Sequence, residues 1–360
     1  MTNRQRSNTG AAGCVVPFMI KVKNIYYMLS YAYQSLNEAS FKNIQTEEFE
    51  NLHDLMAAIL VRGVSNQLKR GLHKDYLVYT EATGNLKGKI DISNSVRQNT
   101  LMTRRMVCHF DQFSENTPLN QIVKTTMVLL IKSGDVTVAN SKELKKLSLY
   151  FRNIETLNPF AINWNALIYH RNNATYKLLI NICQLIIKGL LMTTETGEYK
   201  MKEFLDDQFM HRLYEKFLLG YFKKDYPHFT VGSSYIKWNV DDDITEFLPN
   251  MKTDITLSYG TKTLIIDAKY YGRTMQTNTL FNSKSIISAN LYQIFTYVKN
   301  KDRTGSGHVS GVLLYAKTDE ELTPDHDYSI GGNRFSVKTL DLGADWGGIV
   351  GQLRAVAALL

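Results

Sequence analysis

The stretch PNMKTDITLSYGTKTLIIDAK, residues 249–269, predicts a β-hairpin that carries acidic residues on both of its strands. Asp254 lies on the first strand, expected over residues 252–258, Tyr259-Gly260 marks the turn, and the very apolar second strand ends on Asp267 and Lys269. Side chains at positions i and i+2 of a strand share a face, so Asp267 and Lys269 point to the same side. A turn at Gly260 leaves about six residues on each strand, which allows Asp254 to pair alongside them.

Two carboxylates and a lysine at one end of a hairpin form a pattern that suits a metal site for phosphodiester cleavage. Mg²⁺ takes oxygen ligands, typically one or two carboxylates together with water and substrate oxygens. Asp254, Asp267 and the Ala268 carbonyl would supply such ligands, and Lys269 would hold the attacking water and favour its deprotonated form. About four Asp/Glu-x-Lys/Arg matches are expected by chance in a chain of this composition. A structural ion pair is therefore the alternative interpretation of the pattern.

Three residues outside the hairpin are predicted to join this site. Glu215 lies in a helix expected over residues 206–224 and has apolar neighbours three, four and seven positions later. We expect its carboxylate to be half-buried and to need a partner or a metal ligand role. Gln293 and Tyr297 share one face of a helix expected over residues 288–299, where they would orient the substrate backbone or the lysine. Polar caps on a helix edge are the alternative.

The composition is that of a globular protein with 44% hydrophobic and 21% charged residues. No apolar run reaches the roughly 18 residues that a membrane span needs, and we expect no membrane association. Three separated cysteines without paired spacing argue against a disulfide framework or a zinc site and favour a cytoplasmic location. The isolated histidines, which lack metal-ligand spacing, are interpreted as structural: His109, His211 and His308.

A length of 360 residues permits two domains. We predict a disordered leader or tag over residues 1–18, an N-terminal domain over 19–170 and a C-terminal domain over 171–360. The C-terminal half reads as a helix, three strands, a helix and a further strand, which predicts a mixed sheet flanked by helices. The fold class is therefore α/β or, with less regular alternation, α+β.

The N-terminal half combines helical patterns with a basic β-hairpin. Helices are expected over residues 24–36, from Thr46 to Gly71 and from Pro118 onward. The net charge of +8 is concentrated in the first third of the chain. A hairpin predicted over residues 76–92 carries Lys87 and Lys89 there, and such a projecting arm suits a polyanion or an acidic partner surface. A solvated basic face explains the charge equally well.

The ordered set of candidate residues resembles the PD-(D/E)xK nuclease superfamily. The matching residues are Glu215, Asp254, Asp267-Ala268-Lys269 and Gln293-x-x-x-Tyr297. The proline–acid pair of the superfamily name is not intact, because Pro249 lies five residues before Asp254.

More closely, the chain from about Lys23 resembles the McrC family, the nuclease subunit of McrBC methylcytosine-dependent restriction systems. The segments that carry this resemblance are KNIYYMLSYAY (23–33), LKGKIDI (86–92), LYEKFL (213–218), MKTDITL (251–257), LIIDAKYY (264–271) and NLYQIFTYV (290–298). The family commonly has arginine where this chain has Lys89, which keeps the charge but not the bidentate geometry.

The resemblance implies a Mg²⁺-dependent endonuclease acting on double-stranded DNA, with Asp254, Asp267, Ala268 and Glu215 as the metal ligands. It also implies a partner, McrB, whose hexameric AAA+ ring hydrolyses GTP and receives the N-terminal half of this chain in its central pore. The predicted basic hairpin with Lys87 and Lys89 is the element that we expect to make this contact. The chain contains no GxxxxGK[ST] motif, so GTP would be bound by the partner. Two alternatives are a catalytically inactive docking subunit of a AAA+ ring and a stand-alone RecB-like nuclease.

Overall fold

The computed structural model describes residues 20–33, 36, 41, 44, 47–49, 51–171, 173–193, 199–201, 207–242, 244–270, 275–278, 283–317 and 323–360. The leader predicted over residues 1–18 lies outside these ranges. Two compact units are present: an N-terminal unit of residues 26–213, and a C-terminal unit of residues 214–360 together with 1–25. The domain boundary predicted at residue 170 falls inside the N-terminal unit, because α7 (Tyr176–Leu185) packs against α3 (Leu52–Arg70) and α5 (Pro118–Ser133).

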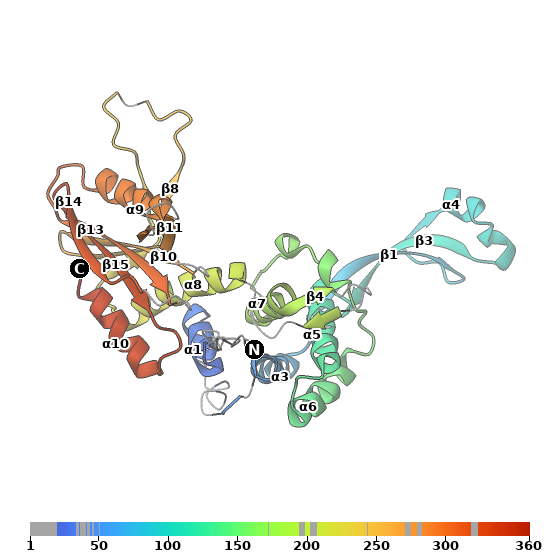
Figure 1. Cartoon of the computed structure of the whole chain (residues 1–360). Coiled ribbons are helices and arrows are strands. Elements are labelled where there is room, and N and C mark those ends of the chain that lie inside the picture. Colours follow the sequence, from blue (N-terminus) through green and yellow to red (C-terminus); the bar gives the residue numbers. More distant parts are fainter. Residues whose placement is uncertain are drawn as a thin grey trace, which may run out of the picture. The chain divides into compact units, whose positions relative to one another are not determined.

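Helices form the body of the N-terminal unit (Figure 1). Two further helices belong to it besides α3, α5 and α7: α6 (Val138–Ser148) and most of α1 (Val22–Ala32), whose first residues belong to the C-terminal unit. After α7 the chain forms a π-helix (Ile186–Leu190) and then the short antiparallel pair of β4 (Leu191–Thr193) and β5 (Tyr199–Met201). The predicted start of α3 at Thr46 is wrong. The helix begins after Asn51, whose side-chain oxygen accepts a hydrogen bond from the Asp54 amide at 2.8 Å. None of the described helices has the length and apolarity of a membrane crossing.

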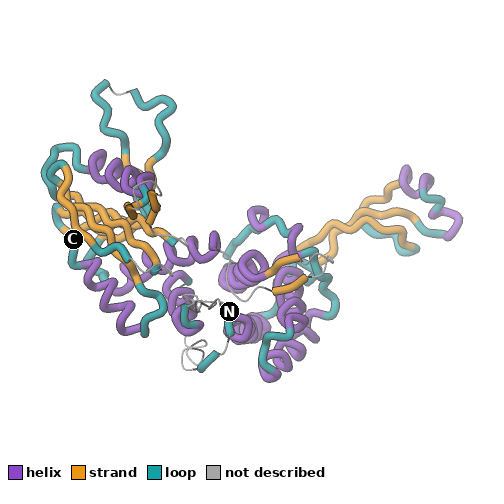
Figure 2. Tube along the Cα trace, in the orientation of Figure 1, coloured by secondary structure: helices purple, strands orange, loops and turns teal. Residues whose placement is uncertain are grey.

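A three-stranded antiparallel sheet projects from this helical body (Figure 1), and residues 75–114 are called the arm below. Its strands are β1 (Asp75–Thr83), β2 (Lys89–Asp91) and β3 (Met106–Ser114), in the order β1-β3-β2. At the far end, α4 (Ile92–Arg97) and the 3-10 helix Thr100–Thr103 connect β2 to β3 (Figure 2). The projecting basic element is thus present, with Lys87 and Lys89 on it.

The hairpin pairing predicted over residues 76–92 is wrong, because β1 and β2 both pair with β3 and not with each other. Two features explain this arrangement. The partner strand supplies the buried residues Val107 and Cys108, which are 2% and 0% exposed. Gly88 has φ +61, and a Cβ atom there would lie 2.2 Å from the His109 carbonyl oxygen, so only glycine lets the chain approach β3 so closely.

One mixed sheet of six strands is the centre of the C-terminal unit (Figure 2). The strands lie in the order β14 (His326–Ile330), β15 (Asn333–Leu340), β13 (Val309–Ala316), β10 (Lys262–Lys269), β9 (Ile255–Tyr259) and β6 (Thr230–Gly232). β10, β13 and β15 run parallel, and the other pairs are antiparallel. The mixed α/β sheet expected from the sequence is confirmed.

Helices cover both faces of this sheet (Figure 1). Side chains of α9 (Ser288–Lys301), Ile294 and Val298 among them, pack with Ile265 and Leu313 of the sheet in one apolar core. The opposite face is covered by α8 (Asp207–Asp225) and α10 (Trp346–Ala357), with the Tyr214 hydroxyl donating to the Leu314 carbonyl at 3.5 Å. Two short pairs, β7 (Tyr235–Ile236) with β8 (Met251–Lys252) and β11 (Met275–Asn278) with β12 (Ser283–Ile286), complete the described strands. The face under α9 is the one that carries the candidate site.

Candidate active site

The hairpin of β9 and β10 brings the two aspartates together. Pairing runs from Tyr259 with Lys262 to Ile255 with Ile266, so Gly260 and Thr261 form a two-residue turn and Gly260 adopts φ +58. Asp254 consequently stands beside the end of β10. Its Oδ2 atom accepts a hydrogen bond from the Ala268 amide at 2.9 Å, which confirms the predicted pairing.

Asp267 and Lys269 form a buried ion pair on the face covered by α9. Asp267 is 1% exposed and Lys269 is 7% exposed. The Nζ atom of Lys269 lies 2.9 Å from Asp267 Oδ2 and donates to Gln293 Oε1 at 3.1 Å. Burying a charged pair carries a large desolvation cost, which only good geometry and further hydrogen bonds offset. Burial excludes a surface ion pair, whereas a buried structural ion pair stays the alternative to a metal site.

Gln293 and Tyr297 extend this network from α9 to the strand that precedes Asp254. The Gln293 amide nitrogen donates to the Tyr297 hydroxyl at 3.0 Å, and that hydroxyl donates to the Lys252 carbonyl at 3.1 Å. These bonds fix the amide so that its oxygen faces Lys269. Gln293 therefore contacts Lys269 directly, and Tyr297 contacts Gln293 and the Lys252 carbonyl.

The carboxylates repel one another. Burial, followed by the charges of Asp267 and Glu215, raises the pKa of Asp254 to about 7, although the Ala268 hydrogen bond and the Lys269 charge act in the opposite direction. Glu215 is half-buried on α8, as expected, and its charge is close enough to act on Asp254. A bound cation would relieve this repulsion.

The donor chemistry of the site fits Mg²⁺. Asp254 and Asp267 supply carboxylate oxygens, and the Ala268 carbonyl lies on the β9 side of β10, beyond the last paired residue of β9. No cluster of three or more acidic, histidine or cysteine side chains suited to a metal exists among the described residues. Two carboxylates suffice for Mg²⁺, which keeps several water ligands. The role of Glu215 as a further metal ligand stays a prediction.

Thr253 is a supporting residue that the sequence did not single out. Its side chain is 1% exposed, accepts a hydrogen bond from the Ser234 amide at 2.9 Å and lies 2.9 Å from the Thr256 hydroxyl. It anchors the backbone immediately before Asp254. A threonine beside a predicted acid was the only signal in the sequence, and it is too common to be informative.

Replacing Asp254 with asparagine is expected to stabilise the metal-free protein at pH 8. The folded-state pKa of about 7 exceeds the ordinary value of 3.8, so ionisation of Asp254 costs stability as the pH rises through this interval. The neutral amide avoids this cost. Thermal unfolding in EDTA should show Asp254→Asn melting several degrees above the wild type at pH 8, with the difference shrinking towards pH 4.

Asp241→Asn, which removes an exposed carboxylate of the same unit, is the control and should show no such pH dependence. Mg²⁺ should stabilise the wild type but not Asp254→Asn. A melting difference between Asp254→Asn and the wild type that is the same at pH 4 and pH 8 would contradict the raised pKa of Asp254.

Comparison with known proteins identifies the family. The family model described as "McrBC 5-methylcytosine restriction system component" matches residues 5–316. This chain belongs to that McrBC family. The membership expected from the sequence is confirmed.

One relative within the McrBC family is the "Type IV methyl-directed restriction enzyme EcoKMcrBC" of Escherichia coli (strain K12). It is 31% identical over 332 residues, which cover 91% of this chain and 94% of the relative. A similar solved structure is the half-complex from a tetradecameric assembly of Thermococcus gammatolerans McrB AAA+ hexamers with bound McrC. The TM-score is 0.51 at 17% identity, over 94% of this chain and 76% of that one, so this likeness concerns the fold.

Proposed function

We propose that this chain is the Mg²⁺-dependent DNA endonuclease subunit of a GTP-driven, 5-methylcytosine-dependent restriction system. The observation that carries the proposal is the buried pair of Asp267 and Lys269 at the end of one hairpin, in contact with the half-buried Gln293 of α9 and beside the half-buried Asp254. It combines acidic oxygen ligands with a fixed ammonium group, as a PD-(D/E)xK nuclease core requires. Family membership supports the restriction role, because the matching model describes a 5-methylcytosine restriction system component.

Each residue of the network has a role in this proposal. Asp254, Asp267 and the Ala268 carbonyl would hold Mg²⁺, with Glu215 adding negative charge nearby; the ion would supply polarisation of the scissile phosphate and a more acidic water. Lys269 would hold the attacking water near its ammonium group and favour the hydroxide form. Gln293, fixed by Tyr297, would keep that ammonium group in place.

The proposed partners are double-stranded DNA and a McrB-like hexameric AAA+ ring that binds and hydrolyses GTP. The similar solved assembly of Thermococcus gammatolerans contains McrB AAA+ hexamers with bound McrC. In this chain the arm is the element suited to such contact, because it projects and carries Lys87 and Lys89 (Figure 1). Lys87 lies with its Nζ atom 5.0 Å from the centre of the Phe110 ring. The cytoplasmic location stays a prediction.

Two rival functions remain distinguishable by experiment. An inactive docking subunit is disfavoured because the two aspartates and the lysine are intact and in contact. A stand-alone nuclease would cut DNA with Mg²⁺ alone, whereas we expect the purified chain to leave plasmid intact until the ring and GTP are added. Cutting by the chain alone at the rate of the full complex would contradict the proposed dependence on a partner.

Reversing both charges on the arm, Lys87→Glu with Lys89→Glu, is expected to weaken docking to the ring by at least about tenfold, because two attractions become repulsions. Size-exclusion chromatography and GTPase stimulation measure docking. The pair Lys142→Glu and Lys145→Glu, exposed on α6 of the same unit, is the matched control. Mg²⁺-induced stabilisation should be unchanged in both. Normal docking of the Lys87/Lys89 variant would show that the arm charges do not make the contact.

A further inference from the structure

The arm joins the body of the N-terminal unit through two chain crossings, and one side-chain amide bridges them. Residues 71–74 lead into β1 and residues 115–117 follow β3, and we call these two segments the arm root. The Asn120 amide nitrogen donates to the His73 carbonyl at 2.8 Å and to the Glu115 carbonyl at 2.7 Å. A single group on the first turn of α5 thus holds both crossings.

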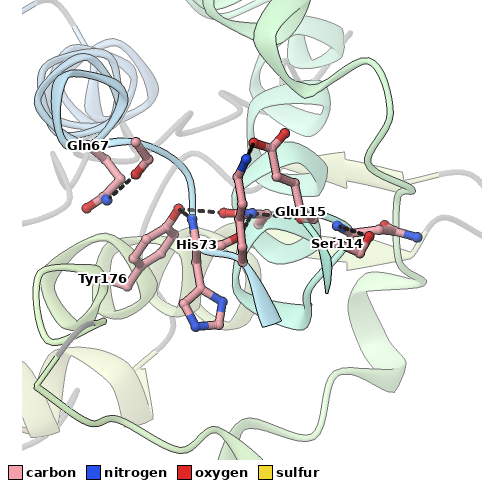
Figure 3. Close-up of polar contacts among 9 residues, drawn as sticks. Gln67, His73, Ser114, Glu115 and Tyr176 are labelled. Carbon is pink, nitrogen blue, oxygen red and sulfur yellow. Dashed lines mark hydrogen bonds and ion pairs between the residues drawn. The ribbon is translucent and has the colours of Figure 1, made fainter. Parts of the chain in front are cut away.

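Tyr176, on the first turn of α7, closes this bridge into a ring of hydrogen bonds (Figure 3). Its hydroxyl accepts from the His73 amide at 2.9 Å and donates to Asn120 Oδ1 at 2.5 Å. Asn120 is 0% exposed and Tyr176 is 2% exposed, so water cannot replace these bonds. A fully satisfied buried polar network specifies one geometry, since any displacement leaves buried groups unpaired.

Further contacts hold the same root. Thr117 stands at the cap position of α5, yet its hydroxyl does not cap the helix and lies 3.1 Å from His73 Nδ1. Gln67 of α3 donates to the Gly71 carbonyl at 2.8 Å, and Lys74 pairs with Glu115 at 3.1 Å (Figure 3). Side chains of three helices of the N-terminal unit, α3, α5 and α7, therefore form hydrogen bonds with the arm root.

The arm itself is tied together across its strands. His109 of β3 contacts Thr80 of β1 through Nδ1 at 2.6 Å and Asp91 of β2 through Nε2 at 3.0 Å. A nine-residue strand spans about 30 Å, so a swivel of about 10° at the root would move the tip by about 5 Å. Because the arm is braced internally, the root determines where its tip lies.

We propose that Asn120 and Tyr176 form an orientation lock: they are positioning residues that hold the arm in the one direction in which it can engage its protein partner. The partner is the ring of the proposed function, on which this part of the inference rests. The lock needs no contact between Asn120 or Tyr176 and that partner. The lock keeps the arm of nearly every molecule in the direction that permits docking. The apparent affinity for the ring falls in proportion to the fraction of molecules in that state, so losing the lock lowers the affinity.

The test compares Tyr176→Phe with Tyr26→Phe. Tyr26→Phe likewise removes a buried hydroxyl of the N-terminal unit, one that donates to the Phe41 carbonyl at 3.3 Å and lies outside the arm root. Spin labels on Met102→Cys at the arm tip and Lys142→Cys on α6 report the arm direction, with Cys14 replaced by serine. Cys108 and Cys183 are 0% exposed and should not label. Distances are measured by pulsed electron resonance on the full chain.

We expect Tyr176→Phe and Asn120→Ala to broaden the distance distribution at least about twofold and to lower apparent ring affinity by a similar or larger factor. Tyr26→Phe should match the wild type in both readouts. The lock would be overturned if the distance distributions of Tyr176→Phe and Asn120→Ala were as narrow as that of the wild type. It would also be overturned if Tyr26→Phe broadened the distribution equally. Broadening without any loss of ring affinity would overturn the claim that docking needs one arm direction, whereas the Lys87→Glu with Lys89→Glu variant tests separately whether the arm docks at all.

A measurement on the unmodified chain covers the case in which the root variants do not fold. The His73 amide should exchange its hydrogen as slowly as the interior amides of α5, because it donates to a buried hydroxyl. Exchange as fast as in the exposed loops would overturn the lock.

Discussion

Asp267→Asn is expected to abolish DNA cleavage by the assembled complex, with a loss of at least about 1,000-fold. The side chain is 1% exposed and lies 2.9 Å from the Lys269 ammonium group. Asparagine keeps the shape but removes one of two ligand charges and leaves the buried lysine without its counter-ion. The measurement is the rate at which plasmid is linearised. GTPase stimulation should persist, because the arm belongs to the other unit.

Asp341→Asn is the matched control for this substitution. It removes the carboxylate of another ion pair in the same unit, in which Lys317 lies 2.6 Å from Asp341, outside the candidate site. We expect a cleavage rate within about twofold of the wild type, because an ion pair that is partly exposed to water contributes little to stability. Cleavage by Asp267→Asn at a rate close to that of Asp341→Asn would show that the hairpin is not the catalytic site.

Lys269→Met is the second substitution with a large expected effect. Methionine keeps most of the apolar stem and removes the ammonium group, so the attacking water loses the cation that favours its deprotonated form. Cleavage should fall by about 100-fold or more. Mg²⁺ binding should persist or tighten, because Lys269 competes for Asp267 at 2.9 Å. Titration calorimetry measures the metal affinity, and a plasmid assay measures cleavage.

The two substitutions thereby separate metal binding from water activation. Asp267→Asn should lose both cleavage and metal affinity, and Lys269→Met should lose cleavage alone. A large loss of Mg²⁺ affinity in Lys269→Met would contradict the role assigned to the lysine and would indicate that it supports the ligand geometry instead.

The hairpin and its candidate residues could be predicted because they depend on local periodicity. The period of two places Asp267 and Lys269 on one face, and the turn at Gly260 fixes which residues of β9 and β10 pair. The helical period likewise places Gln293 and Tyr297 together, and they bond at 3.0 Å. The contact of Tyr297 with the Lys252 carbonyl joins two distant segments, and no pattern within either segment encodes it.

The arm shows where local patterns fail. Strands β1 and β2 are neighbours in sequence, which favours a hairpin, but the best partner for both is β3, later in the chain. Non-local pairing of this kind depends on which strand supplies buried residues, here Val107 and Cys108. The strands β14 and β15 were not predicted, although Gly331 and Gly332 between them, at φ +58 and +86, are a strong two-residue turn signal.

DNA cleavage by the reconstituted complex is the most direct measurement of the proposed function. Plasmid containing 5-methylcytosine, the McrB-like GTPase and this chain are combined with GTP, in Mg²⁺ or in EDTA. We predict double-strand breaks only when the chain, the GTPase, GTP and Mg²⁺ are all present, and none in unmethylated plasmid. Equal cleavage in EDTA, or equal cleavage when the chain is omitted, would contradict the assignment of a Mg²⁺-dependent nuclease site to Asp254, Asp267 and Lys269.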